Sequence, residues 1–245
     1  MSIHEERDTR HWEELEKLIG NEHLTTKDIL TNWQSYVRRR DMTRFLSHYE
    51  LFKEVIGLPG SIVELGVFKG ASFFTWSKLL ETFCPGDRTR KVYGFDHFEG
   101  LVDFVDTDGV YDERAGKTEG GWKATKSHAT TLIELHNQDN FLMGVERCRL
   151  IEGNILDTVE NFIKKNPGLR ISLLHFDMDI YEPTVHALRL LYPLVVRGGV
   201  VVFDQYAIPP WEGETKAVDE FLKQENIVVK KHPFTIHPSG WFKKP

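Results

Sequence analysis

The sequence has few cysteines and no long apolar segment. Its 245 residues include two cysteines, Cys84 and Cys148, which lie far apart and form no metal-binding or redox motif. No stretch approaches the roughly 18 consecutive apolar residues that a membrane-spanning helix needs. The charged N-terminus MSIHEERDTRHWEELEKL is unlike a secretory signal. These absences predict a cytoplasmic protein without a disulfide framework and without a membrane segment.

The sequence also lacks an excess of positive charge. Lys and Arg number 31 against 37 Asp and Glu, which gives a formal net charge of −6 and argues against nucleic acid as a partner. The 11 histidines form no His-x-x-His or His-x-x-x-His pair, so we expect no zinc site built from histidines. The G-x-G-x-x-G spacing of dinucleotide-binding enzymes is absent as well.

The first 57 residues predict a helical segment distinct from the remainder. They contain only two glycines, Gly20 and the last residue Gly57, and no proline, and apolar residues recur at helical spacing, as in Trp12, Leu15, Leu18 and Ile19. The run Leu58-Pro59-Gly60 then ends this region. We expect residues 1–57 to serve as a lid over the substrate or as a dimer surface of a homo-oligomer, and residues 58–245 to form one domain.

From Ser61 onward, short apolar strands alternate with helical stretches. The expected strands are Ser61–Leu65, Lys91–Phe95, Arg149–Glu152, Arg170–Phe176 and Val200–Phe203, and the expected helices are Ala71–Phe83, Val159–Lys165, Pro183–Val195 and Lys216–Gln224. Strands that are apolar at nearly every position favour a parallel sheet covered on both faces. The extended runs Ile227–Lys231 and Phe234–His237, followed by Gly240-Trp241-Phe242, predict an antiparallel pair that closes one edge of the sheet. The pattern therefore predicts a doubly wound, mostly parallel α/β sheet.

Four of the expected strands meet an acidic residue at or near their carboxyl ends, namely Glu64, Asp96, Asp177 and Asp204. In an open doubly wound sheet, ligands bind in the crevice outside these ends. The first strand leads into Glu64-x-Gly66-x-x-x-Gly70, where glycines allow the backbone to approach a ligand closely. Asp96 can accept hydrogen bonds from both hydroxyls of a ribose. These features together predict a site for a cofactor that contains adenosine.

The third strand ends in Gly153-Asn154, and two interpretations of this turn stay open. It could meet an adenine ring, or it could be a plain turn in which Asp157 or Thr158 caps the next helix. The polar stretch 103–127 is long for a loop, and loops of this length are usually functional lids or disordered segments.

The segment from Asp177 to Thr184 and the tripeptide Asp204-Gln205-Tyr206 carry the strongest chemical signal. Carboxylate and amide oxygens brought together suit a hard cation such as Mg²⁺. A metal on an alcohol oxygen would lower the pKa of the alcohol, and one carboxylate could take the proton. Asp179 could assist the metal or only cap the helix that starts near Pro183.

With these residues in place, the chain resembles the macrocin O-methyltransferase family, whose members methylate hydroxyls on deoxysugars in antibiotic and surface-glycan pathways. The resemblance rests on six segments: VELGVFKGAS (63–72), GFDHFEGL (94–101), FDMDIYEPT (176–184), LYPLVVRGGVVVFDQY (191–206), KAVDEF (216–221) and GWFKK (240–244). It implies a class I methyltransferase fold with a seven-stranded sheet, S-adenosylmethionine as cofactor, a small-molecule sugar substrate and Mg²⁺ at the substrate hydroxyl.

The resemblance also implies roles for individual residues. Those that would line the cofactor are Glu64, Gly66, Val67, Phe68, Lys69, Gly70, Ser72, Asp96, His97, Phe98, Glu99, Gly153, Asn154 and Asp177. Asp177 would also be the general base and a metal ligand beside Asp204 and Gln205. The residues that would face the substrate are Asp179, Tyr181 and Tyr206. The family commonly has a second aspartate where this chain has Gln205, and the loss of that negative charge would weaken metal binding.

Three other functions compete with this interpretation. An NAD-dependent oxidoreductase would share the sheet and the ribose-binding acid but lacks the glycine spacing. A non-catalytic protein that binds sugars or nucleotides would not need four acids at strand ends. An enzyme that methylates a phenol or catechol would use the same fold and the same metal, so only acceptor screening distinguishes it from an enzyme that methylates a sugar. The sequence does not choose between a nucleotide-activated sugar and a sugar already attached to a larger product.

Overall fold

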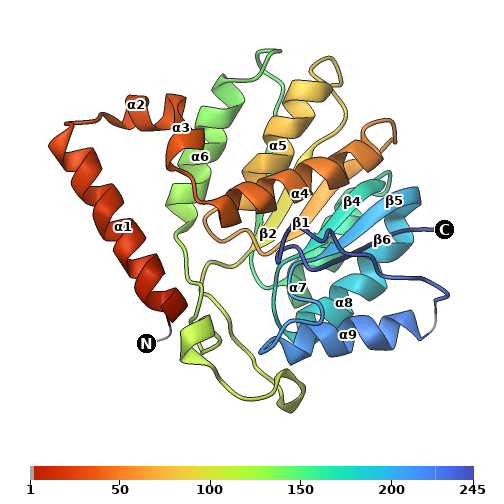
Figure 1. Ribbon diagram of the computed structural model, residues 1–245. Helices are drawn as coiled ribbons and strands as arrows, with labels where there is room; N and C mark the ends of the chain where they lie inside the picture. Colours follow the sequence, from red (N-terminus) through yellow and green to blue (C-terminus); the bar gives the residue numbers. More distant parts are fainter. Residues whose placement is uncertain (1–2, 224) are drawn as a thin grey trace. The chain divides into compact units, whose positions relative to one another are not determined.

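The chain divides into two compact units, Met1–Thr43 and Arg44–Pro245. The structure, a computed structural model, describes residues 3–223 and 225–245. The smaller unit contains α1 (Ile3–Asn21), α2 (Thr26–Thr31) and α3 (Trp33–Tyr36) (Figure 1). The expected helical segment 1–57 therefore covers this unit and the start of the larger one, and its residues 1–2 lie outside the described part.

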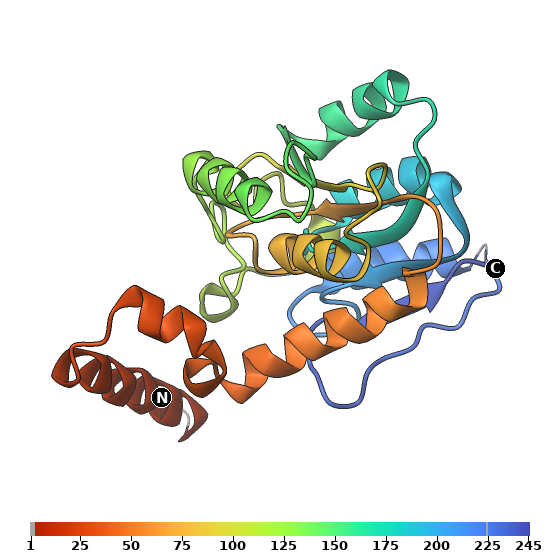
Figure 2. The same cartoon turned by 90° about the horizontal axis from the view of Figure 1, so that it is seen from above.

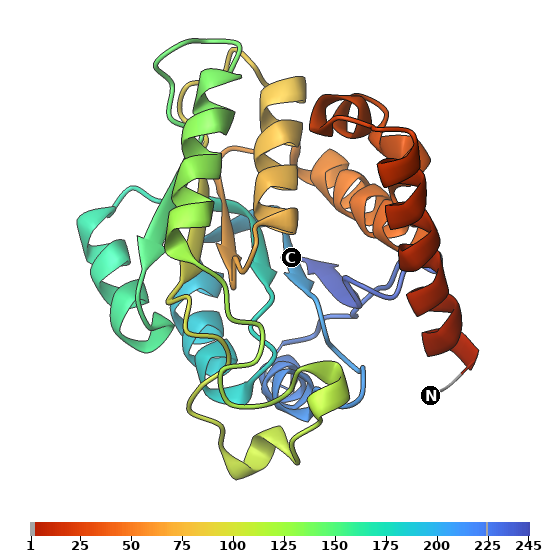
Figure 3. The ribbon, with the colours of Figure 1, turned by 90° about the vertical axis from the view of Figure 1, so that its left-hand side faces the viewer.

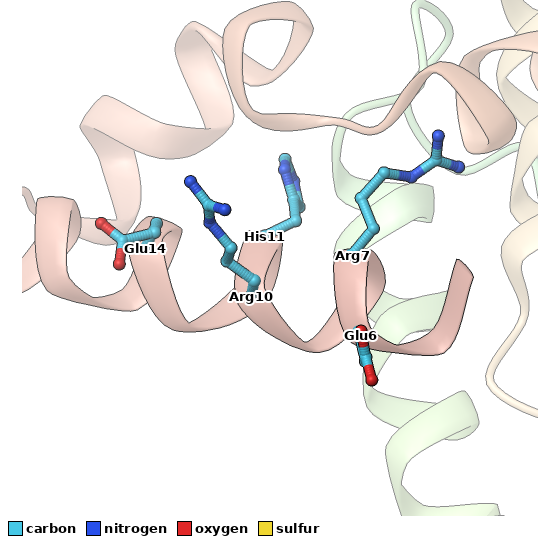
Figure 4. A pocket seen from close by; sticks show the side chains of 5 residues that line it. All are labelled: Glu6, Arg7, Arg10, His11 and Glu14. Atoms are coloured by element: carbon cyan, nitrogen blue, oxygen red, sulfur yellow. The ribbon is translucent and has the colours of Figure 1, made fainter. Parts of the chain in front are cut away.

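Local interactions define the helices of the smaller unit. Thr25 and Asp28 form a capping box in which each side chain accepts a hydrogen bond from the backbone N–H of the other, so α2 begins at Thr26. Arg38 pairs with Asp8 of α1. An open hollow on α1 is lined only by residues of that helix (Figure 4): Glu6, Arg7, Arg10, His11 and Glu14. No helix in the described ranges is long and apolar enough to cross a membrane.

The larger unit is built on one sheet. Its strands are β1 (Ser61–Leu65), β2 (Val92–Asp96), β3 (Cys148–Glu152), β4 (Ile171–Phe176), β5 (Val195–Phe203) and β6 (Gly240–Lys243). They lie in the order β3-β2-β1-β4-β5-β6, with every pair parallel except β5 and β6. This arrangement confirms the predicted doubly wound, mostly parallel α/β fold.

Helices cover both faces of this sheet. They are α4 (Arg39–Val55), α5 (Ala71–Phe83), α6 (Lys126–Gln138), α7 (Ile155–Lys165), α8 (Tyr181–Leu191) and α9 (Glu212–Leu222). Apolar side chains of α4 and α5 form one core with the sheet, and those of α7, α8 and α9 form the other. Figure 2 shows the orange α4 and the teal α7 on opposite sides of the strands.

The pleat of the strands decides which side chains reach which core. In β1, Val63 and Leu65 join the core under α7 and α8, whereas Ile62 joins the core under α4 and α5. Glu64 lies on the same side of the pleat as Ile62 and bonds to Ser72 of α5. The polar residues of these buried strands therefore gather under α4 and α5.

One detail of the predicted sheet is wrong. Within the described residues the sheet has six strands, not the seven that we expected. The segments 227–231 and 234–237 form no strand, and Lys230 makes only an isolated bridge to Trp241. Pro233 has no backbone N–H to continue a ladder there. The predicted antiparallel pairing at the C-terminal edge is confirmed, and it is made by β5 and β6, the strand that contains Gly240-Trp241-Phe242.

Several element boundaries also differ from the prediction. β5 begins at Val195 rather than Val200, because its Gly198-Gly199 pair interrupts the apolar run that marked the strand. The preceding helix, α8, correspondingly ends at Leu191. α6 was not predicted at all. Gln224, the expected end of the last helix, lies outside the described residues, and α9 ends at Leu222.

Gly66 is required where β1 ends. Its φ is 90°, and a Cβ atom at this position would lie 1.9 Å from the carbonyl oxygen of Asp177. We expect Gly66→Ala to lower the free energy of unfolding by about 2–4 kcal/mol, because the backbone must move and an L side chain disfavours this φ. Urea denaturation measures the change.

Gly168→Ala is the matched control, because nothing lies within 4 Å of a Cβ atom added there. Its effect should stay within about 1 kcal/mol. Equal losses in the two variants would contradict the close approach of Gly66 to Asp177.

Candidate active site

The strand order reverses between β1 and β4, and the loops that follow these two strands meet at that point. From β1 the chain proceeds to β2 and β3 on one side, then returns to β4 and β5 on the other. The N–H of Asp177 donates to the carbonyl of Leu65 at 2.9 Å. Crevices at such reversals are where open α/β sheets bind ligands.

Strained backbone is concentrated around this crevice. Phe68, Phe98, Asp179 and Ala207 all have φ between 51° and 68°, and each follows a different strand: β1, β2, β4 and β5. Left-handed backbone at residues other than glycine is costly, and it tends to persist where a site requires a particular loop shape. The strained residues therefore lie at the carboxyl ends of the strands, the edge of the sheet where the sequence predicts the ligand site.

Asp96 holds the loops after β1 and β2. Its Oδ2 accepts hydrogen bonds from the backbone N–H groups of Val67 and Phe68 at 2.9 and 2.7 Å, and its Oδ1 accepts one from Phe98 at 2.6 Å. The carboxylate thus fixes the first loop against the second. Lys69 places its ammonium 5.3 Å from the centre of the Phe68 ring.

Glu64 is fully buried beneath this loop. Its Oε1 accepts a hydrogen bond from Ser72 Oγ at 2.9 Å, and its Oε2 lies 3.3 Å from Nδ1 of His175. Ser72 belongs to the first turn of α5, and Gly70 is the N-cap of that helix with φ of 87°. These contacts bind β1, β4 and α5 together directly under the crevice.

The turn after β3 shows which residue caps the following helix. Asn154 caps α7, because its Oδ1 accepts the N–H of Leu156 at 3.0 Å, and neither Asp157 nor Thr158 takes that role. Gly153 donates its N–H to the carbonyl of Asp96 at 3.1 Å, so this turn adjoins the second loop.

The other predicted residues of the second loop lie nearer its surface. His97 Nδ1 accepts the N–H of Glu99 at 3.1 Å, and Glu99 is exposed.

Two carboxylates and one guanidinium form the centre of the site. Asp177 follows β4 and Asp204 follows β5, so these neighbouring strands bring them together. Nη2 of Arg44, on α4, lies 2.9 Å from Asp177 Oδ2 and 3.1 Å from Asp204 Oδ1. One cationic nitrogen therefore bridges the two acids.

The two carboxyl groups have opposite pKa shifts. Burial raises the pKa of Asp177 to about 7, with the Asp204 charge adding to the rise and Arg44 opposing it. Burial also acts to raise the pKa of Asp204, but Arg44, His175 and His237 hold it well below its usual range. Asp204 is therefore the permanent anion, and Asp177 is the group that exchanges a proton near neutral pH.

His175 is a buried cation. It pairs in register with Glu64 across β1 and β4, and its Nε2 lies 3.6 Å from Asp204 Oδ1. Burial acts to lower the pKa of the ring, but the two carboxylates outweigh this effect and raise it to about 10. His48, His175 and Asp204 place ligand atoms within 4.8 Å of one another. Two carboxylates, Glu64 and Asp204, thus lie on the two sides of the His175 ring.

Four buried oxygens of this cluster have no hydrogen-bond partner in the described part of the chain: Asp179 Oδ1, Asp204 Oδ1, Gln205 Oε1 and Glu214 Oε2. The Asp204 oxygen makes only ion pairs, with Arg44 and His175. Burial and neighbouring acids raise the pKa of Asp179 and of Glu214 well above their usual ranges. Glu214 Oε1 accepts the N–H of Gln205 at 2.8 Å. Buried polar atoms are normally satisfied, so such a group points to a missing polar ligand.

The expected metal ligands converge, but they do not fit a divalent cation as they stand. Gln205 Nε2 lies 3.2 Å from Asp204 Oδ2 and 3.5 Å from Asp177 Oδ1, so the amide presents a donor where a metal needs an oxygen. Arg44 already occupies the position between the two carboxylates.

The two tyrosines predicted to face the substrate bond to α9. Tyr181 donates its hydroxyl to Glu220 Oε2 at 2.6 Å, and Tyr206 donates to Asp219 Oδ1 at 2.9 Å. Burial and this bond to Asp219 raise the pKa of Tyr206 to about 12. The structure therefore uses both hydroxyls to attach α9 and does not bring them to Asp177.

The polar segment predicted as a lid is folded and anchored. It contains the short helical turns η1 (Asp106–Asp108) and η2 (Glu113–Ala115), and it runs beside α9 (Figure 3). The Asp108 carboxylate accepts the N–H of Tyr181 at 2.7 Å, and the ring of Trp122 lies edge-on to Phe68 with centroids 5.5 Å apart. Lys117 is buried and bonds to Glu212 Oε2 at 2.6 Å. The segment thus spans the loops after β1, β4 and β5.

Sequence reasoning missed four residues that shape this site: Arg44, Lys117, His175 and Glu214. His175 left a signal, because it is the one titratable residue inside the apolar strand ISLLHF. Arg44 left none, because it follows the run Arg38-Arg39-Arg40, and consecutive arginines are typical of a solvated helix face.

The sequence profile described as macrocin O-methyltransferase matches residues 14–237. The chain is similar to the 8-demethyl-8-(2,3-dimethoxy-α-L-rhamnosyl)-tetracenomycin-C 4′-O-methyltransferase of Streptomyces olivaceus. The two are 30% identical over 153 residues, an alignment that covers 62% of this chain and 55% of that protein. The chain spans 55–63% of the lengths of the curated relatives that it matches.

Solved structures match over nearly the whole chain. A calicheamicin methyltransferase superposes with a TM-score of 0.88 at 30% identity, covering 97% of this chain and 92% of that one. Its apo form, described as a TDP-rhamnose 3′-O-methyltransferase of calicheamicin biosynthesis, superposes with a TM-score of 0.80 at 28% identity, covering 97% and 94%.

Proposed function

The chain belongs to the macrocin O-methyltransferase family, and from this we propose that it transfers a methyl group from S-adenosylmethionine to a hydroxyl of a 6-deoxyhexose. The observation that carries the proposal is the position of Asp177, a partly buried carboxyl beside the crevice whose pKa lies near neutrality. It is surrounded by buried oxygens that lack donors among the described residues.

The residues at the crevice fit the cofactor. Gly66 leaves no room for a side chain next to Asp177, and Asp96 holds the loop amides around the same opening. We assign the cofactor contacts to the loops 64–72, 96–99 and 153–154, as the sequence predicts. When bound, S-adenosylmethionine supplies an electrophilic methyl group from its sulfonium.

The buried oxygens of Asp179, Gln205 and Glu214 favour a sugar as acceptor. Three acceptors or protonated carboxyls side by side match a molecule with several hydroxyl groups. A catechol or phenol would instead need an apolar slot for its flat ring. A structural relative described as acting on TDP-rhamnose and a curated relative described as acting on a rhamnosyl group of tetracenomycin C support the same class.

Asp177 is the proposed general base. The acceptor O–H bond breaks as the new O–C bond forms, its proton passes to the Asp177 carboxylate, and the carbon–sulfur bond of the sulfonium gives its electron pair to sulfur. Asp204 stays ionised beside it and Arg44 balances the charge of the two acids. No step uses a metal, because the ligands predicted for Mg²⁺ do not fit one with Arg44 in place.

Other expectations from the sequence stay predictions. These are a cytoplasmic location, a homo-oligomer, a role in antibiotic or surface-glycan biosynthesis, and a lid or dimer surface formed by residues 1–57. A role for Tyr181 and Tyr206 at the substrate also stays a prediction.

Ligand binding and acceptor screening test the proposal. We expect S-adenosylhomocysteine to bind with about micromolar Kd or better and NAD⁺ to give no heat in parallel calorimetric titrations, because the crevice lacks the glycines for a pyrophosphate. TDP-rhamnose, a rhamnosyl glycoside and catechol are then offered with labelled S-adenosylmethionine. Methylation of either sugar supports the proposal and tells the two sugar forms apart, whereas methylation of catechol alone would overturn it.

Asp177→Asn removes the proposed base without changing its size. We expect kcat to fall by about 10²- to 10⁴-fold, the usual contribution of a general base. The Kd of S-adenosylhomocysteine should change little. Asp157→Asn, at an exposed position on α7, is the control and should leave kcat unchanged. Normal turnover of the Asp177→Asn variant would exclude Asp177 as the base.

The pH profile follows from the Asp177 pKa of about 7. Only the ionised carboxylate accepts a proton, so kcat/KM should rise with pH through about 7 and fall about tenfold per pH unit well below it. Binding of S-adenosylhomocysteine, measured at the same pH values, should stay nearly constant. A profile that is flat from pH 5 to 8 would contradict this assignment.

A further inference from the structure

The guanidinium of Arg44 lies where a metal ion would have to bind. Its Nη2 contacts Asp177 Oδ2 at 2.9 Å and Asp204 Oδ1 at 3.1 Å, and these two oxygens come from the ends of neighbouring strands. A divalent cation bridging the two acids would need the same volume. Because Arg44 extends from α4, the helix that covers this face of the sheet, its position is part of the fold of the larger unit.

Gln205 is complementary to the arginine and not to a metal. Its Nε2 donates toward Asp204 Oδ2 at 3.2 Å and toward Asp177 Oδ1 at 3.5 Å. Asp177 therefore receives a hydrogen bond from Arg44 and a long one from Gln205, whereas Asp204 receives a hydrogen bond from Gln205 and an ion pair from Arg44. An aspartate at position 205 would place a third negative charge here, and a single arginine could not balance it.

Two histidines also lie against the second carboxylate. His237 Nδ1 lies 3.4 Å from Asp204 Oδ2, and His175 Nε2 lies 3.6 Å from Asp204 Oδ1. With Arg44, three nitrogen-bearing side chains face Asp204, which is fully buried. A divalent ion added to this set would meet strong repulsion from the guanidinium at close range.

We propose that Arg44 and Gln205 together replace the divalent metal in this protein, so that it transfers its methyl group without Mg²⁺. Arg44 is a positioning residue: it holds Asp177 and Asp204 side by side and keeps Asp177 aimed at the acceptor hydroxyl. The part of the inference that concerns catalysis rests on the proposed function, and the part that concerns metal binding does not.

Metal binding to the protein as isolated is the first test. After dialysis against EDTA, Mn²⁺ is titrated and free Mn²⁺ is followed by electron paramagnetic resonance, with and without S-adenosylhomocysteine. We expect no stoichiometric Mn²⁺ site in the wild-type protein. Stoichiometric binding at micromolar Mn²⁺ would overturn the proposal, whatever the acceptor proves to be.

The double variant Arg44→Ala/Gln205→Asp removes the cation and restores a third carboxylate. We expect it to gain a Mn²⁺ site, because three acidic oxygens then face a space without a competing charge. Arg189→Ala, at an exposed position on α8, is the control and should gain none. A purely structural role of Arg44 would not produce a metal site. A folded double variant that binds no Mn²⁺ would contradict the replacement.

Activity provides the second readout once an acceptor has been found. The kcat of the wild-type protein should agree within about twofold in EDTA and in excess Mg²⁺. The Arg44→Lys variant should retain more activity than Arg44→Ala, because lysine keeps the positive charge. Loss of activity in EDTA that Mg²⁺ restores would overturn the proposal. If no sugar is methylated, the proposed function fails, but the Mn²⁺ titrations still decide the metal question.

Discussion

Carboxyl groups gathered at the ends of buried strands need cations beside them, and the larger unit is arranged to supply these. Asp204 is fully buried, and an unpaired charge at such a position would cost several kcal/mol. Arg44 reaches it from α4, His175 from β4 and His237 from the segment before β6. Helix α4 and the C-terminal segment are therefore needed for the site as well as for the core.

The register of the sheet determines which charges meet. Glu64 pairs with His175 across β1 and β4, and the pleat turns both side chains toward α4 and α5. Asp204 follows Val202 on the same side of β5. A shift of one residue would turn these groups into the apolar core under α7 and α8, so the buried charges and the apolar alternation specify the same register.

The sequence predicted the sheet, its two-sided covering and the edge that carries the site, because these depend on short-range apolar patterns and on acids at strand ends. It missed the extension of β5 across Gly198-Gly199 and the helix α6, whose apolar pattern is weak. The role of Arg44 could not be predicted, because an arginine after an arginine run looks the same whether it faces solvent or Asp177, 133 residues away. The bonds from the hydroxyls of Tyr181 and Tyr206 to α9 could not be predicted for the same reason, because tertiary packing decides the direction of these side chains.

The centre of the site is balanced in charge but incomplete in hydrogen bonds. Arg44, His175 and His237 pair with Asp204, and Arg44 also pairs with Asp177, whereas one oxygen each of Asp179, Asp204, Gln205 and Glu214 has no hydrogen-bond donor among the described residues. The fold therefore leaves hydrogen-bonding groups open beside the proposed base. Since an unmade buried hydrogen bond costs about 1–3 kcal/mol, a ligand rich in hydroxyls gains affinity that a flat aromatic ring cannot. Selectivity for the acceptor would then come from these oxygens rather than from the base itself.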